Sequence, residues 1–80
     1  MFRTLVKTAV VAADPQPIDV RYFEVRTPRG ARRYSVEIFV GPGDRIILDD
    51  DSMTNLEART ARLVPATLLS RQLAAKATAA

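Results

Sequence analysis

Arginine side chains carry most of the binding chemistry available to this chain, and they gather in one short stretch. Residues 21–33 contain five arginines but only one glutamate. A guanidinium group can form paired, charge-assisted hydrogen bonds with phosphate, so such a cluster could bind an anion or a nucleic acid. The candidate contacts are four arginines of this stretch and two from further along the chain: Arg26, Arg29, Arg32, Arg33, Arg59 and Arg62. The alternative is that these side chains are solvated and keep a strand edge from pairing with other chains.

The residue types that carry most enzyme chemistry are missing. The chain has no histidine and no cysteine, so it lacks the commonest general base near neutral pH and any thiolate nucleophile or metal ligand. The glycines at positions 41 and 43 precede a predicted strand and not a helix, so they indicate a turn rather than a phosphate-binding loop. A chain of 80 residues also leaves little room for a concave pocket. We therefore expect no catalytic residue, no cofactor and no small-molecule substrate.

Three consecutive aspartates, Asp49, Asp50 and Asp51, could hold a divalent cation. Consecutive side chains at a strand end point in different directions, however, and the spacing matches no EF-hand loop. The aspartates come directly before a predicted helix, whose positive N-terminal end favours negative charge. We therefore interpret them as part of a helix start and expect no metal site.

Length and composition favour one small domain that gains stability from a partner. A chain of 80 residues buries only about 60–65% of the surface that its unfolded form exposes. Small domains often depend on a disulfide, a metal or a second subunit, and the absence of cysteine and histidine leaves the second subunit. The formal charge of +3 is divided into positive, negative and positive blocks, which is less concentrated than in most nucleic-acid-binding proteins. No apolar run reaches the ~20 residues that span a bilayer, and Lys7 interrupts any signal-peptide core, so we expect a cytoplasmic protein.

Two stretches rich in β-branched and aromatic residues, 18–27 and 32–40, predict an antiparallel pair of strands. Between them, Pro28 and Gly30 indicate a tight turn. If Pro28 faces Ala31, the register gathers these apolar residues on one face: Phe23, Val25, Tyr34, Val36 and Ile38. The opposite face is then largely polar near the turn, which is typical of a sheet with one covered face.

A third strand is predicted over residues 45–49, after a second turn at residues 41–44. Pairing Val40 with Arg45 puts Ile47 opposite Ile38 on the core face. The same register gathers five apolar residues on the outer face: Val20, Tyr22, Phe39, Ile46 and Leu48. An exposed patch of this size is typical of a protein interface, and the alternative is that residues 2–13 cover it.

The C-terminal third predicts a helix interrupted by a proline. Thr54 and Glu57 match a capping box, and apolar residues follow at helical spacing. Pro65 lies in the middle, so we expect two helical pieces, roughly 54–63 and 66–77, or one kinked helix. Residues 2–13 fit either a helix or a strand, and their valines and threonines favour a strand. The predicted core combines all of these elements: Phe23, Val36, Ile38, Ile47, Leu56 and Leu63.

Together, these patterns predict an α+β fold in which three or four antiparallel strands carry a C-terminal, proline-interrupted helix on one face. We expect one domain over residues 1–77, followed by a frayed alanine-rich tail at residues 78–80. For function, we expect a non-catalytic small protein that acts through protein–protein contact as a homodimer. The alternative is a nucleic-acid-binding protein that uses a basic β-hairpin tip.

Overall fold

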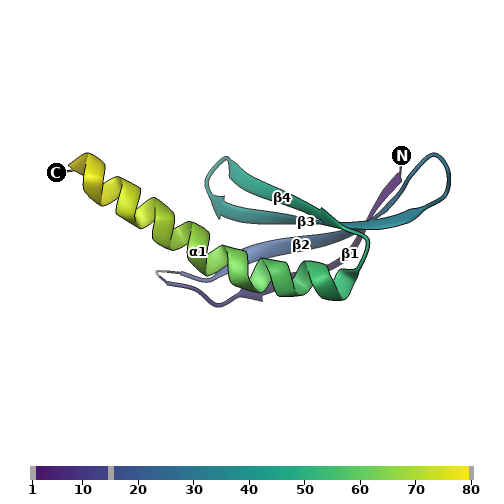
Figure 1. Ribbon diagram of the computed structural model, residues 1–80, viewed down its shortest axis with the longest axis horizontal. Coiled ribbons are helices and arrows are strands. Elements are labelled where there is room, and N and C mark those ends of the chain that lie inside the picture. Colours follow the sequence, from purple (N-terminus) through teal and green to yellow (C-terminus); the bar gives the residue numbers. More distant parts are fainter. Residues whose placement is uncertain (1, 15, 80) are drawn as a thin grey trace.

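The computed structural model describes residues 2–14 and 16–79, which form an antiparallel sheet followed by one long helix (Figure 1). The elements are β1 (Phe2–Val11), β2 (Ile18–Arg26), β3 (Arg32–Gly41), β4 (Asp44–Asp50) and α1 (Met53–Ala79). The strands lie in the order β1-β2-β3-β4, so each one pairs with its neighbours in sequence. The predicted α+β class, the antiparallel sheet and the C-terminal helix are confirmed. The N-terminal segment forms a strand, as its composition favoured.

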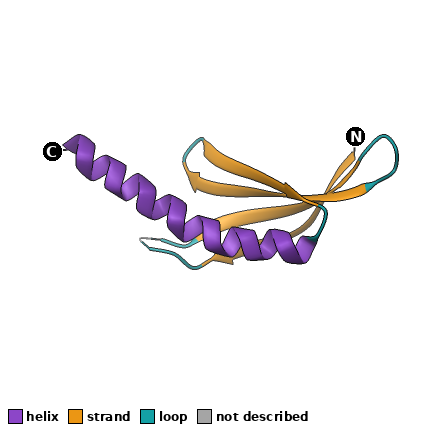
Figure 2. Ribbon diagram, in the orientation of Figure 1, coloured by secondary structure: helices purple, strands orange, loops and turns teal. Residues whose placement is uncertain are grey.

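The helix α1 lies along one side of the sheet (Figure 2). Apolar side chains of the sheet and the helix meet there and form the core: Ile18, Val20, Tyr22, Val36, Ile38, Val40, Leu56, Val64 and Leu68. On β2 and β3 these are alternate residues, as expected for strands that have one covered face. We call this side of the sheet the helix side and the opposite side the open face.

The first hairpin closes differently from the prediction. The backbone N–H of Thr27 donates to the carbonyl of Ala31 (3.0 Å), and the N–H of Gly30 donates to the carbonyl of Thr27 (2.9 Å). The N–H of Ala31 also donates to the hydroxyl of Thr27 (3.1 Å). Gly30 has a φ of 82°, which is the left-handed conformation that ends a three-residue hairpin loop. Thr27, and not Pro28, therefore faces Ala31, so the predicted register of β2 and β3 is wrong by one residue.

This shift exchanges the two faces of β2, because a one-residue slip moves every side chain of a strand to the other side of the sheet. Val20 pairs with Ile38, and Tyr22 pairs with Val36. Val20 and Tyr22 therefore belong to the core. Phe23, which was predicted to be in the core, lies on the open face.

The second hairpin also departs from the prediction by one residue. Its turn, residues 41–44, closes as expected, but a β-bulge at Val40 shifts the pairing that follows. Ile46, and not Ile47, therefore lies opposite Ile38. Ile47 was predicted to be in the core but is exposed on the open face.

Ser52, and not the predicted Thr54, caps the helix. The hydroxyl of Ser52 accepts a hydrogen bond from the N–H of Asn55 (3.2 Å), and its carbonyl accepts one from the N–H of Leu56 (3.0 Å). The N–H of Ser52 donates to the Oδ1 atom of Asp50 (2.9 Å). The bonds of the Asn55 and Ser52 N–H groups satisfy donors that a helix start leaves without intrahelical partners, and the bond from Leu56 is the first one of the helix itself.

The helix is continuous through Pro65, so of the two predicted alternatives, two helical pieces or one kinked helix, the structure excludes the two pieces. A proline at this position removes the hydrogen bond to the carbonyl of Ala61, but both residues are exposed, so water can take the place of the missing donor. The buried side chains of Val64 and Leu68 hold the helix to the sheet on both sides of the proline. Packing therefore outweighs the local preference of proline.

The last part of α1 extends past the sheet (Figure 1). Arg71 forms an ion pair with Asp44 at the turn between β3 and β4. Every side chain from Leu69 to Lys76 is exposed. Residues 78 and 79 of the predicted tail belong to the helix, and Ala80 lies outside the described residues.

Candidate binding surfaces

The five residues that were predicted to share one exposed interface lie in different environments. Val20 and Tyr22 are buried in the core. Ile46 and Leu48 are on the same helix side and pack, partly buried, against that core. Phe39 alone among the five lies on the open face. These residues therefore do not form a single exposed surface, because the register shift turned four of them towards α1.

The open face carries a set of arginine and phenylalanine side chains instead. Strand alternation and the observed register put six such residues there: Arg3, Arg21, Arg33, Arg45, Phe23 and Phe39. Of these, only Arg33 was a predicted anion contact. Each strand contributes one arginine to this set, at an odd-numbered position. That spacing is a sequence signal, but it places the arginines on one face only once the register is known.

A buried carboxylate lies at the centre of the open face. Glu37 is only 4% exposed, although α1, the helix of the described residues, lies on the other side of the sheet. Its carboxylate forms ion pairs with Arg3 of β1 and with Arg45 of β4, the latter at 3.2 Å. The two arginine side chains are 44% and 55% exposed, so their stems cover the carboxylate while their charged ends reach water. Glu37 thus orients arginines from both edge strands over the middle of the sheet.

Two arginines of this face lie over phenylalanine rings. The Cζ atom of Arg3 is 3.9 Å from the centre of the Phe23 ring, and that of Arg21 is 4.9 Å from the centre of the Phe39 ring. Both separations are within the ~6 Å over which a cation is attracted to the face of an aromatic ring. Each ring therefore helps to fix a guanidinium group above the sheet.

The arginines of the hairpin tip do not act as one group. Arg26 and Arg32 pair across β2 and β3, and both approach Glu24, at 3.4 Å and 3.2 Å. Glu24 offsets the repulsion between these two like charges. Arg33 lies on the open face, and Arg29 lies in the exposed turn. The predicted six-arginine site is therefore divided between the two sides of the sheet, the turn and the helix.

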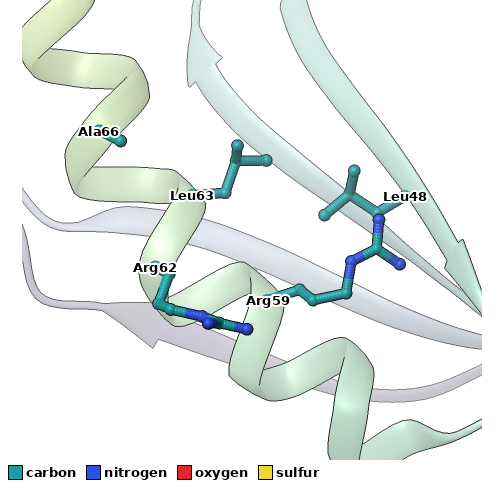
Figure 3. Close-up of a pocket in the computed structure, with 5 residues that line it drawn as sticks. All are labelled: Leu48, Arg59, Arg62, Leu63 and Ala66. Atoms are coloured by element: carbon teal, nitrogen blue, oxygen red, sulfur yellow. The ribbon is translucent and has the colours of Figure 1, made fainter.

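The two helix arginines of that prediction line a groove between α1 and β4. The groove has a volume of about 330 Å³ and is lined by Leu48, Arg59, Arg62, Leu63 and Ala66. Figure 3 shows Leu63 and Leu48 directed into the space between helix and strand, with Arg59 extended towards β4. The groove is mainly apolar, and its charged side chains lie along its margin.

The acidic run is tied to the helix start. Arg59 donates to the backbone carbonyl of Asp49 (2.9 Å) and to the carboxylate of Asp50 (3.2 Å). The pKa of Asp50 lies below its ordinary value, chiefly because its carboxylate accepts the backbone hydrogen bond of Ser52, with smaller contributions from Asp51 and Arg59. Among the residues that the structure describes, no group of three or more carboxylates is arranged to hold a metal ion.

Large apolar side chains are exposed mainly in two places. Within the described chain, seven such residues are exposed: Phe2, Leu5, Val6, Val10, Ile47, Leu69 and Leu73. Four of them belong to the edge strand β1, and two belong to the end of α1. These two regions are the apolar surfaces that the fold leaves uncovered.

Comparison with known proteins finds no protein family, no curated protein and no solved structure that matches this chain. In the described part of the chain, no helix combines the length and the apolar character needed to cross a membrane. Function therefore has to be inferred from the chemistry of the surfaces themselves.

Proposed function

We propose that this chain is a non-catalytic protein-binding module that works as a cytoplasmic homodimer. The observation that carries the proposal is the exposed end of α1. Leu69 and Leu73, each 57% exposed, lie one turn apart on the same side of the helix, and Ala66 lies one turn before them. We call these three residues the helix-end strip.

The end of α1 has little tertiary support within its own domain. Beyond the ion pair of Arg71 with Asp44, the helix extends past the sheet. Isolated helices shorter than about 12–15 residues are marginal in water, and most helices in proteins are stabilised by packing of an apolar face. A second copy of the chain can supply that packing.

The edge strand β1 of the second copy is the surface best suited to receive the helix-end strip. It carries Phe2 and Val6, which are exposed apolar side chains. Direct pairing of two helix ends is less favourable, because it would leave the exposed apolar side chains of β1 uncovered. When the helix end of each copy packs on β1 of the other, twofold symmetry makes the same contact twice.

Both partners must contribute apolar area if the dimer is to be stable. Complete burial of one large apolar side chain is worth about 1.5–3 kcal/mol, and each leucine is 57% exposed, so the four leucines of two helix-end strips contribute roughly 3–7 kcal/mol. Association itself costs an estimated 4–15 kcal/mol. The leucines thus offset part of that cost, and the exposed apolar residues of β1 must supply the rest.

Size-exclusion chromatography with light scattering tests the proposal on two double variants. We expect Leu69→Asp with Leu73→Asp to give a folded monomer, because the charges prevent burial of the strip. The matched control, Ser70→Asp with Gln72→Asp, adds the same charges to other sides of the exposed helix end and should remain dimeric. Circular dichroism checks that both variants are folded. A dimer that survives the leucine substitutions would contradict the proposed surface.

A further inference from the structure

The open face of the sheet combines planar cations, aromatic rings and a fixed geometry. Arg3 and Arg21 lie over the rings of Phe23 and Phe39 at 3.9 and 4.9 Å. A guanidinium group in this position has one side against a ring, while its other side can stack on a further planar group. Arginine planes and aromatic side chains are the surfaces on which proteins stack unpaired nucleic-acid bases.

We propose that the open face binds single-stranded nucleic acid, whose bases stack on the guanidinium groups of Arg3 and Arg21. This activity is separate from dimerisation, which uses the end of α1 and the edge of β1. It also differs from binding through the hairpin tip, because the residues that act are in the middle of the sheet.

The buried Glu37 prepares this face for a ligand. It holds Arg3 from one edge strand and Arg45 from the other, so neither side chain has to be ordered when the ligand binds. Their side chains nevertheless remain 44% and 55% exposed, so their outward-facing N–H groups can donate to phosphate. A carboxylate at this depth therefore orients the arginines without closing the surface.

The exposed charge of the face complements a polyanion. Four arginines lie on it, and three acidic residues accompany them: Asp19, Glu37 and Asp49. Glu37 is buried beneath arginines, so the carboxylates exposed to the ligand are Asp19 and Asp49, and the four arginines exceed the three acidic residues by one charge. The resulting surface is positive overall.

The shape of the face favours single strands over duplexes. A broad sheet surface presents no helix or loop that could enter a groove of a double helix. Stacking on Arg3 and Arg21 also needs bases whose faces are free, which paired bases inside a duplex do not offer. Unpaired strands, in contrast, expose a planar face at every base, so no particular sequence is required.

Fluorescence anisotropy with labelled oligothymidylate and oligouridylate of about twelve nucleotides tests the inference, with a duplex of equal length for comparison. We expect both single strands to bind at least about tenfold more tightly than the duplex. With up to four phosphate contacts, the logarithm of the affinity should fall with the logarithm of salt concentration at a slope of about −3 or less in magnitude.

Three single variants separate stacking from charge. Arg21→Ala should lower the affinity by about fivefold or more, the effect of losing one stacked base. Arg21→Lys keeps the charge but removes the planar group, so we expect a loss close to that of the alanine variant. The control, Arg62→Ala on α1, makes the same change in net charge away from the open face and should alter the affinity less than twofold.

Four binding results would overturn the inference. With the unmodified protein, these are an unchanged anisotropy with either single strand at low salt, and equal affinity for duplex and single strand. With the variants, they are equal losses of affinity in Arg21→Ala and Arg62→Ala, and full affinity in Arg21→Lys. Loss of the dimer in Arg21→Ala, measured by light scattering, would likewise overturn it, because the open face would then be an interface between copies.

Discussion

Removal of both arginines that cover Glu37 should destabilise the protein by more than the two separate losses together. Arg3 and Arg45 are each about half exposed, so a single alanine substitution breaks only one ion pair near the surface. Such pairs are worth about 0.2–1 kcal/mol. The remaining arginine still satisfies the carboxylate, and we expect each single variant to lose at most about 1 kcal/mol.

The double variant leaves a carboxylate without a partner at a position that is 4% exposed. Breaking a buried pair typically costs about 3–5 kcal/mol, because the remaining charge is not compensated. Water that enters the space left by the two long side chains reduces this cost. We therefore expect Arg3→Ala with Arg45→Ala to lose about 2–4 kcal/mol in the free energy of unfolding.

Urea denaturation followed by circular dichroism measures these free energies, and Glu37→Gln supplies the decisive comparison. Added to the double variant, this substitution removes the uncompensated charge and should restore about 1 kcal/mol or more. In the unsubstituted protein, Glu37→Gln should instead destabilise, because it removes both ion pairs. If the two arginine losses are additive and Glu37→Gln restores nothing, the carboxylate is not a buried charge held by these arginines.

Three further predictions concern the core, the helix and pH. Ile38→Ala should lower the free energy of unfolding by about 2–5 kcal/mol, because Ile38 is buried in the core. Ile47 is 49% exposed on the open face, so Ile47→Ala should lower it by less than about 1 kcal/mol. Equal losses for the two variants in urea denaturation would contradict the observed register. Pro65→Ala should raise the thermal midpoint, since it restores a helical hydrogen bond that proline lacks, and a lower midpoint would show that proline stabilises the helix. Asp50 has a lowered pKa in the folded protein, so its contribution is complete well above the ordinary value of 3.8 and is lost as pH falls through the folded value. Asp50→Asn should therefore be less stable than the unmodified protein at neutral pH, with a difference that disappears in strong acid.

The types of the elements could be predicted from the sequence because local signals agree with the fold. β-Branched and aromatic residues mark the strands, and Pro28, Gly30 and residues 41–44 mark the turns. The N-terminal strand was correctly favoured over a helix on its valines and threonines. The observed helix differs from the predicted one in its start and in the effect of Pro65. It starts earlier because Ser52 and not Thr54 is the cap, and it continues through Pro65 because core residues hold it on both sides of the proline.

The register could not be predicted as reliably because both faces of the strands are partly apolar. In β2, Val20 and Tyr22 alternate with Phe23 and Val25, so the pattern fits either face. The hydroxyl of Thr27 and the left-handed Gly30 decide the first hairpin, whose three-residue loop, residues 28–30, ends in that glycine.

The bulge at Val40 leaves no sequence signal of its own, and it sets the register of β4. An error of one residue in the register leaves the predicted elements unchanged but changes which residues share a face. It therefore assigned core residues to the predicted interface, and it did not group the arginines of the open face on one surface. Arg3, Arg21 and Arg45 were missed for this reason, because their common surface exists only after all four strands are aligned.

Sedimentation equilibrium of the unmodified protein over the micromolar range tests the central claim, association into a homodimer, most directly. The chain has a mass of 8.8 kDa. We predict a concentration-dependent mass that approaches twice this value, because the exposed end of α1 and the edge strand β1 bury each other's apolar side chains in the dimer. A mass that stays at 8.8 kDa at every concentration would contradict the claim.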